Sequence, residues 1–177
     1  MPQKHLLLTG YRGCGKSVVG QRLSMALSRD FIDTDTAIES AAGKSIAEIF
    51  EDVGQEGFRD LESQQIANLI TLSMPAVISL GGGSILRPEN REWIRKLGRT
   101  VWLQAEPDTI RVRIADDAST KSRRPKLSQL GDLEDIRSIL EIRMPLYQEV
   151  SDLAVSTDGR TMDEVAATIA DWYRNIP

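Results

Sequence analysis

The sequence feature that most constrains this chain is the octapeptide Gly10-Tyr11-Arg12-Gly13-Cys14-Gly15-Lys16-Ser17, which fits the phosphate-binding pattern G-x-x-x-x-G-K-[ST]. An apolar run, residues 5–9, precedes it, and apolar residues at helical spacing follow it. This order predicts a strand, a glycine-rich turn and a helix whose first N–H groups point at a bound anion. Lys16 is then expected to reach the outer phosphates of a nucleotide, and Ser17 to hold Mg²⁺. The alternative, a chance glycine-rich turn, explains neither the full motif nor its setting.

Composition narrows the classes of protein to which the chain can belong. Its 177 residues suit one domain, and its 41% of hydrophobic residues suffice for a core. No apolar run approaches the length of a membrane-spanning helix, and the first residues lack the apolar core of a signal peptide, so we expect a cytoplasmic protein. The one cysteine excludes an internal disulfide and a cysteine-cluster metal site. A net charge of −4 argues against nucleic acid as a partner.

Short apolar runs alternate with helical patterns along the chain. The runs predict strands at residues 5–9, 31–33, 76–80, 100–104 and 153–156. Residues 45–48 and 161–164 fit capping boxes that open helices. This order predicts an α/β fold with three layers, in which helices cover both faces of a parallel sheet of about five strands. We therefore expect residues 1–177 to form one domain whose ligands bind at the carboxyl ends of the strands.

Two carboxylates follow the second predicted strand. Asp33 and Asp35 are two residues apart, and such residues face the same way on an extended segment. Both carboxylates are therefore expected to point toward the P-loop. Residues 36–39, Thr-Ala-Ile-Glu, fit a capping box and predict that the following helix begins there.

Two arginines fall on the inward faces of predicted helices. Arg59 and Glu62 share the apolar face of the helix predicted over residues 58–72, and Arg143 lies on the apolar face of the helix predicted over residues 132–150. An ion pair at the surface would explain Arg59 and Glu62, and a side chain that extends to solvent would explain Arg143. The spacing alone does not decide whether these arginines have another role.

Three consecutive glycines, residues 81–83, come directly after the strand predicted at residues 76–80. They would let a ligand approach the backbone closely, whereas a flexible turn would need only one or two of them. Residues 116–126 are almost wholly polar and hold the strongest cluster of positive charge in the chain. Such a segment is either a solvated surface loop or a lid that closes on phosphates.

Together these segments resemble the shikimate kinase family over nearly the whole chain. Six segments carry the resemblance: residues 10–17, Asp33-Thr34-Asp35, Phe58-Arg59-x-x-Glu62, residues 79–83, Arg124-Pro125 and Arg143-Met144-Pro145-Leu146-Tyr147. A P-loop alone occurs in many proteins that bind nucleotides, but this ordered set is specific to the family. The resemblance implies a P-loop kinase fold like that of nucleoside monophosphate kinases, with a substrate-binding insertion at residues 34–62 and a mobile lid at residues 116–127.

The resemblance also implies an activity. The γ-phosphoryl group of ATP would pass to the 3-hydroxyl of shikimate, which gives shikimate 3-phosphate and ADP on the route to chorismate and the aromatic amino acids. Mg²⁺ is the implied cofactor, shikimate and ATP are the implied partners, and we expect a monomer. The implied ATP-binding residues are Gly13, Cys14, Gly15, Lys16, Ser17, Val18 and Arg124, and the implied metal-binding residues are Ser17 and Asp33.

The family pattern further implies which residues act on the acceptor. Arg59 and Arg143 match the pair that grips the shikimate carboxylate, and Gly82 matches a backbone contact to the substrate. Asp35 matches the residue that binds the substrate hydroxyls and accepts the proton. Asp35, Lys16 and Arg124 are thus the implied catalytic residues, with Glu62 orienting Arg59.

Some residues have no clear place in the pattern. Arg113 and Arg160 are candidates for adenine contacts, which stay undefined because the segment before Arg124 is longer than in the shortest relatives. Cys14 lies near a helix N-terminus, where thiol pKa values fall, so it is either a reactive thiol or, as we favour, a small residue that fills the loop. His5 is expected at the edge of a strand, without a chemical role.

Two other functions stay open at this point. A related small-molecule kinase, such as a gluconate kinase, would not need the paired Arg59 and Arg143 or the run of glycines. A regulatory nucleotide-binding module that has lost catalysis would show changes at Lys16, Asp35 or Arg124, and all three residues are in place.

Overall fold

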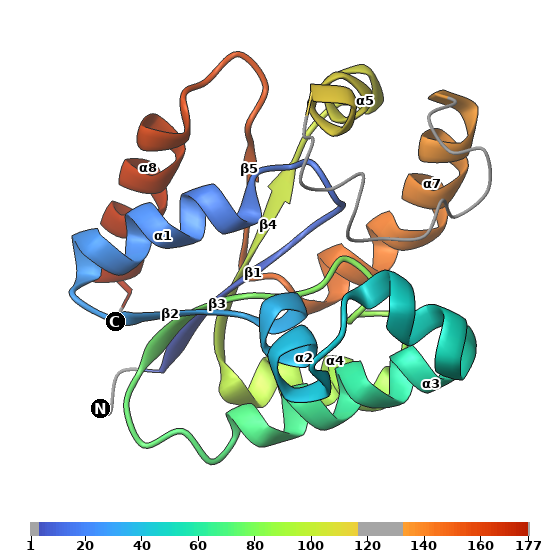
Figure 1. Ribbon diagram of the computed structural model, residues 1–177. Coiled ribbons are helices and arrows are strands. Elements are labelled where there is room, and N and C mark those ends of the chain that lie inside the picture. Colours follow the sequence, from blue (N-terminus) through green and yellow to red (C-terminus); the bar gives the residue numbers. More distant parts are fainter. Residues whose placement is uncertain (1–3, 117–132, 177) are drawn as a thin grey trace.

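A parallel sheet of five strands forms the centre of the fold (Figure 1). The structure, a computed structural model, describes residues 4–116 and 133–176. The strands are β1 (His5–Thr9), β2 (Asp30–Asp33), β3 (Ala76–Ser79), β4 (Gly98–Gln104) and β5 (Leu153–Ser156), and they lie in the order β2-β3-β1-β4-β5. All neighbouring strands are parallel, and Leu7 of β1 lies between Ile78 of β3 and Thr100 of β4. The predicted parallel sheet is confirmed.

Helices cover both faces of this sheet and complete the three predicted layers (Figure 1). They are α1 (Lys16–Leu27), α2 (Thr34–Ala42), α3 (Ile46–Leu69), α4 (Pro88–Leu97), α5 (Pro107–Asp116), α7 (Leu133–Val150) and α8 (Met162–Arg174). Helices α1 and α8 pack against each other on one face, while α3, α4 and α7 pack on the other. The lid expected at residues 116–127 lies outside the described residues, apart from Asp116 at the end of α5.

Alternating side chains along β1 divide the core between the two faces of the sheet. Leu6 and Leu8 are fully buried on the face that α1 and α8 cover, whereas Leu7 is fully buried on the opposite face. This is the period of two that a strand imposes, and burial on both faces explains why the run is continuously apolar. Truncation of Leu7 to alanine would cost about 2–5 kcal/mol of stability.

Helix α2 begins earlier than the sequence suggested. The Asp33 carboxylate accepts hydrogen bonds from the backbone N–H groups of Asp35 (3.1 Å) and Thr36 (3.2 Å), so the helix begins at Thr34. The capping box predicted at residues 36–39 is therefore wrong, and Asp35 lies in the first helical turn rather than on an extended segment. The other two predicted boxes are confirmed, Ser45 with Glu48 in α3 and Thr161 with Glu164 in α8.

Helix α3 is interrupted at Gly54, where φ is 69° and ψ is −172°. The helix predicted over residues 58–72 begins earlier than expected, because helical structure resumes directly after Gly54. The resumed helix needs a glycine at position 57. A Cβ atom there would clash with Val53, whose own Cβ atom would be only 2.6 Å away. The kink separates a first half that packs with α2 from a second half that packs on the sheet and carries Arg59.

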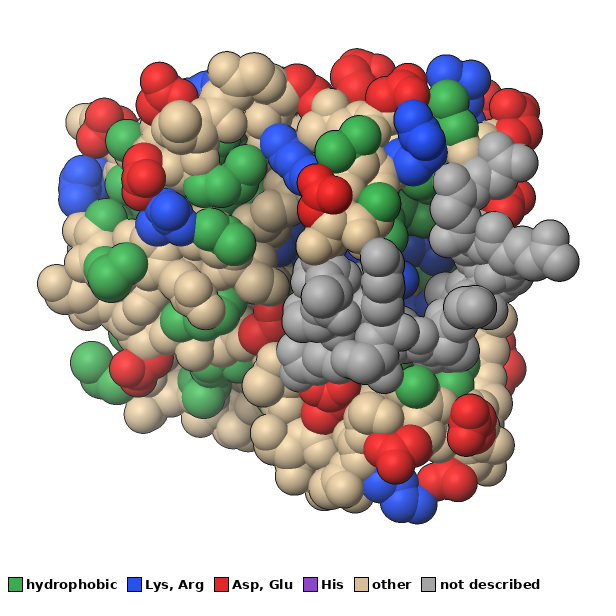
Figure 2. Space-filling view, turned by 45° about the horizontal axis from the view of Figure 1, so that its top comes forward, with side chains coloured by type: hydrophobic (Ala, Val, Ile, Leu, Met, Phe, Trp, Pro, Cys, Tyr) green, Lys and Arg blue, Asp and Glu red, His purple; other side chains and the backbone are tan. Residues whose placement is uncertain are grey.

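The molecular surface carries charges of both signs. On the face shown in Figure 2, Lys and Arg side chains are interspersed with Asp and Glu side chains. Arg22 of α1 and Asp163 of α8 form an ion pair at 2.5 Å, which links two helices of the same layer. Among the described residues, no helix combines the length and the apolar character needed to cross a bilayer.

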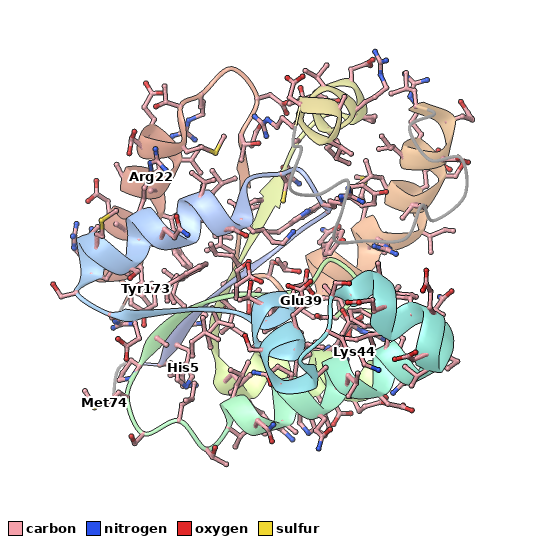
Figure 3. All side chains as sticks on the ribbon, viewed as in Figure 1. His5, Arg22, Glu39, Lys44, Met74 and Tyr173 are labelled. Carbon is pink, nitrogen blue, oxygen red and sulfur yellow. The ribbon has the colours of Figure 1, made fainter. Side chains whose placement is uncertain are left out.

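His5 lies at the end of a strand, as expected, and it is buried there. His5 is the first residue of β1, the central strand, and is buried at the end of the strands opposite the P-loop (Figure 3). Its Nδ1 atom accepts a hydrogen bond from the backbone N–H of Ala76 at 3.0 Å. Burial, together with the nearby Arg29 guanidinium, lowers the pKa of His5. His5 is therefore a neutral acceptor that helps to hold β3 beside β1.

Candidate active site

A cavity of about 710 Å³ opens at the carboxyl ends of the strands, where the sheet topology predicts a ligand. The predicted site residues that line it are Gly13, Gly15, Lys16, Ser17, Val18, Asp33, Asp35 and Gly82. The cavity therefore brings together the P-loop, the end of β2, the start of α2 and the glycines after β3.

The P-loop backbone closely surrounds the space in front of helix α1. Gly10, Gly13 and Gly15 have φ values of 137°, 83° and 94°, which other residues rarely adopt. Lys16 folds back over the loop and donates hydrogen bonds to the carbonyl oxygens of Gly10 (2.8 Å) and Tyr11 (3.0 Å). Since Lys16 also begins α1, the first N–H groups of the helix lack intrahelical partners and are directed toward the loop. This is the arrangement that binds phosphate.

Ser17 and Asp33 form the candidate metal site. The Ser17 hydroxyl donates a hydrogen bond to Oδ2 of Asp33 at 2.8 Å, and both residues line the cavity. A hydroxyl and a carboxylate are the oxygen ligands that Mg²⁺ accepts, and Mg²⁺ usually keeps several waters and binds substrate phosphates in addition. No group of three or more His, Cys, Asp or Glu side chains suited to a metal occurs among residues 4–116 and 133–176. The donor set thus fits a cation that needs few protein ligands.

The loop of residues 81–83 needs its glycines because side chains crowd against it. A Cβ atom on Gly81 would lie 2.7 Å from Oδ1 of Asp35 and 2.8 Å from Oε1 of Glu62. A Cβ atom on Gly83 would overlap the guanidinium of Arg59. The N–H of Gly81 is in turn held by Oγ1 of Thr34 at 3.0 Å. Close approach, rather than the flexibility of a turn, therefore accounts for this run of glycines.

Arg59 and Glu62 form a buried ion pair on the inward face of α3. Their side chains are only 11% and 3% exposed, so the surface pair considered from the sequence is wrong. Ser84 also donates to Oε1 of Glu62 at 3.4 Å. Burial raises the pKa of Glu62, while Arg59 acts in the opposite direction. The carboxylate holds the guanidinium against the glycine loop, which is the orienting role expected for Glu62.

Arg143 reaches the same loop from helix α7. Its Nη1 donates to the carbonyl oxygen of Gly82 at 3.2 Å, and its guanidinium carbon lies 5.8 Å from the centre of the Tyr11 ring. The two arginines therefore approach the glycine loop from different helices. Neither Arg59 nor Arg143 lines the large cavity, in contrast to the other predicted acceptor residues, Asp35 and Gly82.

The remaining candidates differ in their positions. Arg113 lines the cavity and is fixed by Thr157, whose Oγ1 and carbonyl oxygen accept at 2.8 Å and 3.1 Å. Arg160 does not line the cavity and instead donates to the Glu164 carbonyl and the Thr168 hydroxyl along α8. Arg124 lies outside the described residues.

Cys14 occupies the other side of the P-loop. It is fully buried, and with Tyr11 it borders a second cavity of about 430 Å³ between the loop and helices α5 and α7. Its sulfur lies 3.8 Å from Nζ of Lys16. Burial supports the view that Cys14 is a small residue that fills the loop.

Sequence reasoning missed several residues of the site. Arg12, Gln21, Phe31, Ile46 and Met162 line the large cavity. Arg12 carries a signal in the sequence, a basic side chain inside the P-loop itself. Tyr147 ends one of the family motifs and has no predicted role, yet its hydroxyl donates to the Gly82 carbonyl at 2.7 Å.

Comparison with known proteins agrees with this geometry. A family model described as "Shikimate kinase" matches residues 12–174. A shikimate kinase of Rhodopirellula baltica is 45% identical over 94% of this chain and 88% of its own length, and one of Symbiobacterium thermophilum is 38% identical over 94% of both chains. The solved structure of a shikimate kinase from Acinetobacter baumannii in complex with shikimate has a TM-score of 0.89 and 31% identity, covering 96% of this chain and 92% of that one. The resemblance seen in the sequence is confirmed, and the chain belongs to the shikimate kinase family.

Proposed function

We propose that this protein is an ATP-dependent kinase that phosphorylates the 3-hydroxyl of shikimate. The observation that carries the proposal is the position of the glycine loop, residues 81–83. Gly82 lines the same cavity as Lys16, while the neighbouring glycines contact Asp35 and Arg59. The loop thus joins a phosphate-binding half to a half with paired arginines, as transfer between ATP and a carboxylate-bearing alcohol requires.

On the nucleotide side, the P-loop residues Gly13, Cys14, Gly15, Lys16, Ser17 and Val18 would hold the phosphates of ATP through backbone N–H groups and the lysine charge. Ser17 and Asp33 would hold Mg²⁺, which supplies neutralisation of phosphate charge when it is bound. Lys16 would exchange its two carbonyl contacts in the P-loop for phosphate oxygens. Arg124, on the proposed lid, would stabilise charge during transfer.

On the acceptor side, Arg59 and Arg143 would bind the shikimate carboxylate, because a guanidinium presents two parallel N–H donors to a planar anion. Asp35 would bind the hydroxyls and accept the proton of the 3-hydroxyl as it attacks the γ-phosphorus. The N–H side of the Gly82 backbone would contact the ring. Arg113 would remain the candidate for an adenine contact, since it lines the nucleotide cavity.

Release of ADP in the presence of Mg·ATP tests this proposal, with shikimate, gluconate and AMP compared as acceptors. We expect release with shikimate alone. Release with gluconate or AMP would instead favour a related small-molecule kinase. Absence of release with every acceptor, from folded protein that binds ATP, would favour a regulatory module.

The Asp35→Asn variant is the matched control for the chemistry. Asparagine keeps the size and one oxygen acceptor but cannot take a proton, so we expect turnover to be lost while ATP binding persists. Near-normal turnover in this variant would rule out Asp35 as the catalytic base.

Three further expectations stay predictions: the monomeric state, the cytoplasmic location, and the division into a domain with an insertion and a lid. Light scattering tests the monomeric state.

A further inference from the structure

The carbonyl oxygen of Gly82 accepts two hydrogen bonds from the same helix. The Tyr147 hydroxyl donates at 2.7 Å, and Nη1 of Arg143 donates at 3.2 Å. Both donors come from α7 and lie four residues apart, one helical turn, so they reach the loop together. The Tyr147 contact has the usual length of an O–H···O bond, whereas the Arg143 contact is at the long limit for an N–H···O bond.

Tyr147 is fixed where it stands. Its side chain is fully buried, and its ring stacks on Trp102 of β4 with 5.8 Å between the ring centres. Burial raises the pKa of the phenol well above its usual value, so the hydroxyl keeps its proton. The hydroxyl is therefore a permanent donor to the loop.

The two donors differ in what else they can do. In the proposed function, Arg143 binds the substrate carboxylate, and a guanidinium that turns toward a carboxylate weakens its contact to the Gly82 carbonyl. A buried carbonyl that loses its donor is destabilised, which would oppose this movement. Tyr147 removes this cost, because its hydroxyl continues to donate to the Gly82 carbonyl after Arg143 has turned away.

We propose that Tyr147 is a positioning residue for shikimate binding: it holds the Gly82 carbonyl so that Arg143 is available to the substrate carboxylate. This inference deepens the proposed function and rests on it. Without the hydroxyl, the carbonyl depends on Arg143 alone and competes with the substrate for the guanidinium. The effect falls on the binding of shikimate and leaves the binding of ATP as it was.

The test is the Tyr147→Phe variant, which keeps the ring and its stacking on Trp102. We expect the KM for shikimate to rise about tenfold, the size of change that one lost hydrogen bond produces, while the KM for ATP and kcat stay within about twofold. Tyr173→Phe is the matched control, because the Tyr173 hydroxyl contacts the Lys4 carbonyl and Arg29 at the opposite ends of the strands, away from the site. That variant should leave all three constants unchanged.

A double-mutant cycle separates positioning from a general structural role. In an Arg143→Ala background, Tyr147→Phe should cause no further rise in the KM for shikimate, because no guanidinium remains to be competed for. The inference is overturned if the KM for shikimate is unchanged in Tyr147→Phe. It is also overturned if kcat falls and both KM values rise to the same extent, or if the two substitutions are fully additive in the cycle. If Tyr147→Phe does not fold, Trp102→Phe is the second variant. It removes part of the stacking that fixes the Tyr147 ring, so the hydroxyl donates less well to the Gly82 carbonyl. A smaller rise in the KM for shikimate is then expected, and no rise counts against the inference. A wild-type protein without shikimate-dependent ADP release would instead refute the proposed function.

Discussion

Ser17 and Asp33 are joined by a 2.8 Å hydrogen bond that links the first turn of α1 to the end of β2. The Asp33 carboxylate divides its two oxygens between two tasks. Oδ2 meets the Ser17 hydroxyl in the candidate metal site, and Oδ1 caps helix α2. One side chain therefore connects the nucleotide site to the helix that carries Asp35.

Two substitutions of Asp33 separate these tasks. Asp33→Asn keeps an oxygen for the cap but loses the charge, so we expect stability to hold within about 0.5 kcal/mol while kcat/KM for Mg·ATP falls at least about tenfold. Asp33→Ala loses the cap as well and should also lower the free energy of unfolding by about 0.5–2 kcal/mol. Urea denaturation and initial rates over a range of Mg²⁺ concentrations measure the two effects. An unaltered Mg²⁺ dependence in Asp33→Asn would exclude Asp33 from the metal site.

Substitution of Gly83 tests the close approach of Arg59 to the glycine loop. In Gly83→Ala, the new methyl group overlaps the guanidinium and displaces it. We expect the KM for shikimate to rise by about tenfold or more, which corresponds to about 1.4 kcal/mol, with little change in the KM for ATP. Gly43→Ala, at a position with no atom within 4 Å of the new methyl group, serves as the control and should leave both KM values unchanged. Equal kinetics in the two variants would show that Arg59 does not need this contact.

The kink in α3 is expected to depend on Gly54. Its combination of φ 69° and ψ −172° is open almost only to glycine, so Gly54→Ala should lower the free energy of unfolding by about 1–3 kcal/mol. Gly43, at φ 64° and ψ 21°, lies in the left-handed region that other residues can enter at smaller cost. Denaturation curves for the two alanine variants should therefore differ, with Gly54→Ala the less stable. Equal losses would contradict an essential backbone geometry at the kink.

His5 gives the stability a dependence on pH. Because its pKa is lowered from 6.5 in the folded state, the neutral form is favoured on folding. The stability that neutral His5 contributes is complete above pH 6.5. It is lost as the pH falls below 6.5 toward the lowered pKa of His5 in the folded state. Protonation also removes the acceptor for the Ala76 N–H, a bond worth about 1 kcal/mol.

His5→Asn provides the comparison, since asparagine offers an acceptor at the position of Nδ1 and does not titrate. Between pH 7.5 and pH 5.5, the urea midpoint of unfolding should fall further for the wild type than for this variant. The same decline in both proteins would assign the pH dependence to other groups.

The sequence predicted the strands well because strands that are buried on both faces of a parallel sheet are continuously apolar, and few other short segments share this pattern. It failed where a contact from far along the chain decided the outcome. Thr36 and Asp33 could each cap α2, and Asp33 does so through Oδ1 while Ser17 of α1 donates to its Oδ2. The contact of His5 could not be predicted because its partner, Ala76, lies 71 residues away and strand order is not written in any local pattern.

The candidate site was predictable to the extent that motifs mark it. Lys16, Asp35 and Gly82 meet at one cavity, as expected from strand ends alone. Tyr147 could not be assigned a contact, because only the packing of α7 brings its hydroxyl to a loop 65 residues earlier in the chain. The spacing of Arg59 and Glu62 was visible, but only the packed structure shows that their ion pair is buried.

The order of the strands has a consequence for the synthesis of the protein. Of the five strands, β1 is made first, yet both of its neighbours, β3 (Ala76–Ser79) and β4 (Gly98–Gln104), are made much later. Until then the apolar residues Leu6–Leu8 have no strand to pair with, and β2 cannot serve because β3 lies between them. The nascent chain therefore exposes an unpaired apolar strand until β3 has emerged, and both sides of that strand are paired only when residue 104 has emerged. We expect chaperones to bind the chain during this interval.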